Sequence, residues 1–195
     1  MEPRRSDETA AQVVTVEVTG SCALVTALQR TPSGGYLTAL GPFEARVGRS
    51  GPAAPGDKRE GDGRTPTGRF PLRHGFGTRP DPGVAIDWRR VDDDDRWVDD
   101  PASSLYNSWQ REPVAGRWSS AEELVQPEYA YAQVVGVNEE RVPGAGSAIF
   151  LHLLGAGHLL GDGATAGCVA LAEADLLAVL RWQRPGGVLV VTCAG

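Results

Sequence analysis

Short apolar runs separated by glycine turns constrain the fold of this chain more than any other feature. Residues 13–18 and 23–28 are typical of two strands that turn at Gly20. Residues 36–40 form a third run, and residues 43–47 alternate between apolar and polar side chains as a half-buried strand does. With 25 glycines and 14 prolines, this succession predicts a mainly β protein with an antiparallel sandwich or barrel-like core.

The C-terminal third carries the one clear helical pattern. Apolar side chains recur at helical spacing across residues 173–183, and Pro185 with two following glycines ends the helix. Residues 188–192 then predict a buried closing strand. Residues 129–137 and 147–154 also have strand character, and the second of these runs carries His152.

The middle of the chain lacks regular periodicity. Periodicity disappears between residues 48 and 83, where the composition of residues 56–68 predicts a structured loop and residues 69–72 return to the core. Residues 84–128 hold four tryptophans and an acidic run, which favours a loop-rich insertion or lid packed by aromatic side chains. We therefore predict a polar tail over residues 1–11 and a single domain over residues 12–195.

Composition excludes several partners. The net charge of −6 argues against a nucleic-acid or anionic-membrane surface. No apolar run approaches the length of a membrane span, and we expect a monomer. The first residues lack the apolar segment of a secretory signal, which leaves three readings open: an internal protein, a different true start, or a removed leader.

Cys168 and His152 form the strongest candidate site. Cys168 follows Gly167, and we expect it to open the final helix and to face His152 from a neighbouring strand. A helix N-terminus and an imidazole both lower the pKa of a thiol, and the thiolate is the nucleophile. Backbone N–H groups around Gly167 could hold an oxyanion. The alternative is a buried structural cysteine beside a core histidine.

Other roles for these side chains are weaker. His152, His158 and Cys168 could ligate zinc with Asp162 or His74, but the closely spaced ligand pairs of structural zinc sites are missing. We therefore predict no metal and no organic cofactor. Two further cysteines lie in apolar runs and could pair if their strands are neighbours, although buried reduced thiols are the favoured reading for Cys22 and Cys193.

Several motifs together resemble the L,D-transpeptidase (YkuD-like) catalytic domain. His152 followed by Thr165-x-Gly167-Cys168 matches the family's His…[Ser/Thr]-x-Gly-Cys signature. The loop Lys58-x-Glu60-Gly61-Asp62-Gly63-x-Thr65-Pro66-x-Gly68-x-Phe70 is similar to the one before the family's core strand. The segments 97–107 and 146–152 resemble an exported bacterial branch, so the likeness runs from about residue 47 to the C-terminus.

The resemblance implies a β-sandwich-like catalytic domain that acts on peptidoglycan stem peptides without a cofactor. Cys168 would form a thioester with the donor and release D-alanine, and an acceptor amine would then give a 3→3 cross-link. His152 would be the base, oriented by the backbone carbonyl of Leu153, and Thr165 would support the turn. The further substrate-contact candidates are Thr165, Leu153, His158, Ser147 and Asn107.

This chain departs from the family pattern at two positions. Ala166 stands where many members have His or Arg, and Ala170 stands where many have Arg. These changes remove a side-chain oxyanion donor and a possible partner for a substrate carboxylate. An L,D-carboxypeptidase and a catalytically weak wall-binding module are therefore kept as alternatives. The resemblance places the protein in the cell envelope, with a cytoplasmic location as the alternative.

Overall fold

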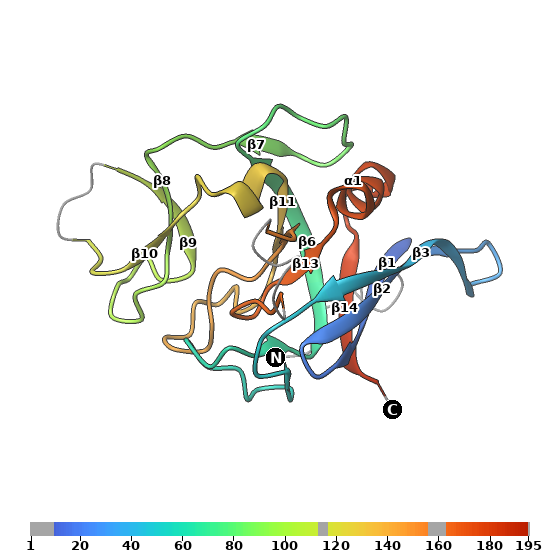
Figure 1. Ribbon diagram of the computed structural model, residues 1–195, viewed down its shortest axis with the longest axis horizontal. Coiled ribbons are helices and arrows are strands. Elements are labelled where there is room, and N and C mark those ends of the chain that lie inside the picture. The colour runs from blue at the N-terminus through green and yellow to red at the C-terminus, as the bar shows by residue number, and fades with distance from the viewer. Residues whose placement is uncertain (1–9, 113–116, 156–162, 195) are drawn as a thin grey trace.

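The computed structural model describes residues 10–112, 117–155 and 163–194, and these residues form a mainly β protein (Figure 1). Nine strands of this part of the chain make one sheet. In spatial order they are β11 (Ala132–Val135), β12 (Phe150–Leu153), β13 (Val169–Leu171), β3 (Tyr36–Arg46), β2 (Cys22–Arg30), β1 (Gln12–Thr19), β14 (Val188–Cys193), β6 (Gly68–Gly77) and β7 (Trp88–Arg90). A further pairing of β11 with β6 closes the series into a barrel-like ring, with β7 attached outside.

The predicted mainly β, barrel-like core is confirmed, but the sheet is mixed rather than purely antiparallel. β1 pairs in parallel with β14, β12 with β13, and β6 with β7. Parallel neighbours need long connections. The chain supplies one between β12 and β13, and α1 (Glu173–Trp182) leads from β13 into β14.

The N-terminal strands form a continuous meander. The two runs predicted at 36–40 and 43–47 are one strand, β3, which stays paired with β2 through an irregularity in register. Gly41 permits this, because a Cβ at that position would lie 2.6 Å from the carbonyl oxygen of Val25. Strand β3 therefore crosses β2 too closely for a side chain at this point.

Two hydrophobic clusters lie on different sides of the main sheet's strands. The larger cluster joins the N-terminal strands to α1, which packs against β12 and β3 through Leu176, Val179 and Leu180. The helix begins and ends close to the predicted bounds. The second cluster is rich in aromatic rings and contains Cys168 and Phe150.

The predicted aromatic insertion contains a second sheet of three strands, β8 (Asp95–Val98), β9 (Ser108–Arg111) and β10 (Ala121–Glu123). Figure 1 shows this sheet beside the main sheet. Trp97 packs edge-on against Phe150 of β12 at 5.1 Å between ring centroids, and Trp109 packs edge-on against Phe76 of β6 at 5.4 Å. The insertion therefore covers the strands that carry the candidate site.

The remaining elements are short. They are β4 (Pro52–Ala53), β5 (Thr65–Pro66) and the 3₁₀ turn η1 (Pro127–Ala130). The turn η1 occupies the start of the run predicted as a strand over residues 129–137. No helix in the described ranges is long and apolar enough to cross a membrane.

The favoured reading of Cys22 and Cys193 as buried thiols is wrong. Both side chains are exposed, and both thiols are free. Cys22 lies on β2 and Cys193 on β14, and β1 separates these two strands. The two cysteines sit at strand ends, beyond the apolar core that the strand centres build.

Candidate active site

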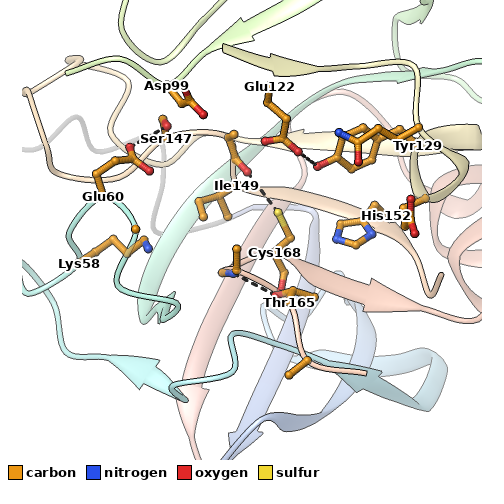
Figure 2. A pocket seen from close by; sticks show the side chains of 17 residues that line it. Lys58, Glu60, Asp99, Glu122, Tyr129, Ser147, Ile149, His152, Thr165 and Cys168 are labelled. Carbon is orange, nitrogen blue, oxygen red and sulfur yellow. Dashed lines mark hydrogen bonds between the residues drawn. The ribbon is translucent and has the colours of Figure 1, made fainter. Parts of the chain in front are cut away.

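The register of two parallel strands brings Cys168 and His152 to one face. Leu151 of β12 pairs with Val169 of β13, so Cys168, one residue before β13, is level with Phe150. Residues two apart on a strand share a face, so His152 lies on the same face as Phe150. Figure 2 shows both the thiol and the imidazole pointing into one cavity.

The thiol of Cys168 is buried and neutral in this state. It donates a hydrogen bond to the carbonyl of Ala148 at 3.2 Å, and its sulfur accepts one from the N–H of Phe150 at 3.3 Å. Burial, reinforced by the negative charge of Glu122, raises the pKa of Cys168 to about 12, although the Phe150 N–H and the charge of Lys58 oppose the rise.

The expected placement of Cys168 at a helix N-terminus is wrong. Cys168 precedes β13, and α1 begins only at Glu173. The helix dipole acts within the first turn of a helix. The helix dipole therefore does not lower the pKa of this thiol. The N–H of Phe150 and the charge of Lys58 do so instead.

His152 is buried, and its ring is held on two sides. Its Nδ1 lies 2.8 Å from the carbonyl oxygen of Leu153, which is the contact that the family resemblance predicts. The ring of Tyr129 packs edge-on against the imidazole, with 5.5 Å between centroids. An Nδ1–H that donates to Leu153 leaves Nε2 as the acceptor for a proton.

Thr165 and Gly167 form a tight turn before Cys168. The hydroxyl of Thr165 donates to the carbonyl of Cys168 at 2.7 Å and accepts from the N–H of Gly167 at 3.0 Å. Gly167 has a φ of +150°, and a Cβ there would lie 2.8 Å from the carbonyl oxygen of Arg64. The turn therefore needs glycine at position 167. The Gly167 N–H can donate to an oxyanion only after its hydrogen bond to Thr165 breaks.

The glycine-rich loop of residues 58–68 packs beneath this turn. The hydroxyl of Thr65 donates to the carbonyl of Gly167 and accepts from the N–H of Gly48, each at 2.8 Å. Glu60, farther along the cavity wall, accepts hydrogen bonds from Tyr106 and from Ser147. The loop therefore fixes the turn before Cys168 and contributes charged side chains to the same cavity.

The cavity around Cys168 has a volume of about 400 Å³ and carries both signs of charge (Figure 2). Glu122 of β10 lies across from the thiol and accepts a hydrogen bond from Tyr129. Burial raises the pKa of Glu122 to about 7, against the effect of the Tyr129 bond and with the charges of Asp99 and Glu60 adding to the rise. The cavity is lined by Lys58, Glu60, Gly61, Asp99, Glu122, Gln126, Glu128, Tyr129, Ser147, Ala148, Ile149, His152, Ala164, Thr165, Ala166, Gly167 and Cys168.

Comparison with known families agrees with this geometry. The model of the YkuD family, the L,D-transpeptidase catalytic domain, matches residues 33–191. The chain belongs to this family. Membership supports a cysteine-dependent activity on the cell wall, and the family is typically extracytoplasmic or associated with the wall. No curated protein sequence matches the chain.

The candidate site brings together some of the predicted substrate contacts and not others. Thr165 and Ser147 line the cavity, and Ser147 donates to Glu60 at 2.7 Å. Asn107 lies outside the lining: its amide donates to the carbonyls of Val137 and Asn138, each at 2.9 Å. Leu153 contributes the carbonyl that His152 contacts. His158 lies outside the described residues.

The described part of the chain contains no cluster of side chains that could form the alternative zinc site. Within that part, no three His, Cys, Asp or Glu side chains are grouped to hold a metal ion. His74, one of the suggested ligands, instead packs against the ring of Trp109 at 5.7 Å between centroids. His158 and Asp162 lie outside the described residues.

Sequence reasoning did not single out four side chains that shape the candidate site. Lys58 and Glu60 belong to the glycine-rich motif of residues 58–70, whose pattern does not distinguish cavity side chains from loop side chains. Glu122 and Tyr129 belong to the insertion and its exit, where no local pattern marks a site residue. The nearest signal was the aromatic content of residues 84–128, which indicates a packed insertion but not which side chains face the nucleophile.

Proposed function

We propose that the protein is an L,D-transpeptidase that forms 3→3 cross-links between peptidoglycan stem peptides. The sulfur of Cys168 attacks the carbonyl carbon at the L-centre of the donor's third residue. The bond to the terminal D-alanine then breaks and leaves a thioester. An acceptor amine attacks that thioester, forms the new amide bond and releases the sulfur.

His152 carries the protons in this scheme. Its Nε2 accepts the proton of the Cys168 thiol during attack and returns it to the nitrogen of the departing D-alanine. In the second half it accepts a proton from the acceptor amine, and the thiol regains its proton at the end. The contact between Nδ1 and Leu153 supports this role, because it favours the tautomer in which Nε2 is free of a proton.

The observation that carries the proposal is the shared cavity of Cys168 and His152 within a chain of this family. The resting thiol donates a hydrogen bond to the carbonyl of Ala148, so transfer of its proton to His152 requires the S–H to rotate away from this carbonyl. A cavity that presents an ammonium and several carboxylates suits a stem peptide, which carries both carboxylate and ammonium groups. We place this activity in the cell envelope. The monomeric state stays a prediction.

Product analysis with a purified disaccharide tetrapeptide tests the proposal. The wild-type protein is expected to release D-alanine and to form tetrapeptide–tripeptide dimers, whereas the Cys168→Ala variant forms neither product. A Cys22→Ser variant is the matched control, since it removes an exposed thiol and retains full activity. Release of D-alanine with a shortened stem and no dimer would replace transfer with hydrolysis. Binding with no product would indicate a wall-binding module.

A further inference from the structure

Lys58 lies in the glycine-rich loop and has no part in the reaction described above. It is also the single lysine of the sequence, because the other 18 of the 19 basic residues are arginines. A lysine carries a compact ammonium on a flexible stem, whereas the guanidinium of arginine is a wide planar fork. The position therefore differs chemically from every other basic position in this sequence.

The Lys58 side chain lies against two glycines, which have no Cβ to obstruct it. A Cβ on Gly146 would lie 2.8 Å from Cγ of Lys58, and a Cβ on Gly167 would lie 3.5 Å from its Nζ. The alkyl stem therefore passes over Gly146, and the ammonium ends beside the glycine that precedes the nucleophile. Figure 2 shows the side chain pointing from the cavity wall toward the Cys168 side of the cavity.

The ammonium is held in one place. Its side chain is 9% exposed, and Nζ contacts the carboxylate of Asp62 at 2.5 Å. That carboxylate also accepts the N–H groups of Arg59 and Arg64, each at 2.8 Å. Although burial opposes it, these bonds, led by the one from Lys58, hold the pKa of Asp62 below its usual value. The bonded carboxylate of Asp62 therefore fixes the position of the Lys58 ammonium at the cavity wall.

The charges around the thiol act in opposite directions. Lys58 is the only lysine or arginine among the described residues that line the cavity, and the lining also contains the carboxylates of Glu60, Asp99, Glu122 and Glu128. The charge of Glu122 raises the pKa of Cys168, and the charge of Lys58 lowers it. Burial in low dielectric strengthens both effects.

We propose that Lys58 is the cationic group of this active site, whose ammonium stabilises negative charge on the sulfur of Cys168 and on the acyl oxygen held beside Gly167. The stabilisation of the acyl oxygen rests on the proposed function. The stabilisation of the thiolate does not, so the two can fail separately.

The alkylation rate of Cys168 by iodoacetamide, followed from pH 7 to pH 9, tests the proposal. A Cys22→Ser/Cys193→Ser background leaves Cys168 as the sole thiol. Lys58→Met keeps the length of the stem and removes the charge, so alkylation at a given pH is expected to slow by about 3- to 10-fold, equivalent to a rise of about 0.5 to 1 unit in the thiol pKa. Lys58→Arg keeps the charge and is expected to stay closer to the parent. Glu122→Gln is expected to speed alkylation.

A parent-like rate in Lys58→Met, or an equal loss in Lys58→Arg, would overturn the proposal. If Lys58→Met does not fold, chemical modification of the folded protein gives the same comparison. Acetylation of Lys58 removes the charge and must slow alkylation, whereas reductive methylation keeps the charge and must not. If neither the substitutions nor the chemical modifications make the alkylation rate depend on the charge at position 58, the proposed role of Lys58 is rejected. If the alkylation rate depends on the charge at position 58 as expected but muropeptide does not acylate the protein, only the proposed function is rejected.

Discussion

Gly167 determines how closely the turn before Cys168 can approach the glycine-rich loop. Replacing it with alanine places a Cβ 2.8 Å from the carbonyl of Arg64 and forces a side chain into a φ of +150°. We expect Gly167→Ala to lower the free energy of unfolding by about 1–3 kcal/mol and to abolish acylation of Cys168. Urea unfolding and labelling of the thiol measure the two effects.

Gly144→Ala is the matched control for this substitution. Gly144 also has a positive φ, of 74°, but its Cβ would meet no atom within 4 Å. The control therefore carries backbone strain without the close contact, and it is expected to keep acylation. Equal losses in both variants would show that the close packing of Gly167 against the loop is unimportant.

Glu122 makes the stability of the protein depend on pH. Burial raises its folded pKa from 4.5 to about 7, against the opposing bond from Tyr129. The stability that this raised pKa contributes is fully present below pH 4.5 and is lost as the pH rises through 7, because the folded state must then hold a buried charge. Glu122→Gln stays neutral. We therefore expect the free energy of unfolding of the variant, relative to that of the wild type, to rise by about 2–3 kcal/mol from pH 5 to pH 8.

Urea unfolding at the two pH values measures this difference. The exposed neighbour Glu123 gives the control, and Glu123→Gln is expected to follow the pH dependence of the wild type. If Glu122→Gln showed the pH dependence of the wild type, then burial would not raise the pKa of Glu122. The claim that Glu122 raises the pKa of Cys168 would then also be wrong.

At the scale of elements, a buried amide pair joins the end of α1 to the main sheet. Gln133 of β11 and Gln183, one residue after α1, exchange two hydrogen bonds of 2.8 and 2.9 Å, and both side chains are buried. Gln133→Leu leaves the Gln183 amide without this partner. An unsatisfied buried polar group costs about 1–3 kcal/mol, and we expect that loss in the free energy of unfolding.

A double-mutant cycle separates this pair from general packing. Replacing both partners with leucine removes the unsatisfied amide, so the double variant is expected to lose less than the sum of the single variants. Thermal unfolding of the four proteins gives the coupling. Strict additivity would mean that the two amides do not act as a pair.

At the scale of the whole molecule, the sequence predicted what local patterns encode. The strand runs, the helix over residues 173–183 and the signature around Cys168 and His152 are each written in short stretches of the chain. Their type and order needed no knowledge of distant contacts. The family resemblance also implied the contact between His152 and the carbonyl of Leu153, which the structure contains.

What the sequence did not predict depends on contacts between distant segments. The parallel pairings and the closure of β11 onto β6 follow from how the sheet assembles. The high pKa of Cys168 follows from burial beneath the insertion and from Glu122, which lies 46 positions before it. A helix N-terminus was expected to activate this thiol, because the short strand β13 between Cys168 and α1 has no pattern distinct from a helix start.

Mass spectrometry of the intact protein, incubated with a carbapenem-like acylating probe, tests the central claim most directly. The account predicts one covalent adduct on the wild type, mapped to Cys168 by peptide analysis, and no adduct on a folded Cys168→Ala variant. An adduct that persisted in this variant, or that mapped to Cys22 or Cys193, would contradict the assignment of Cys168 as the nucleophile.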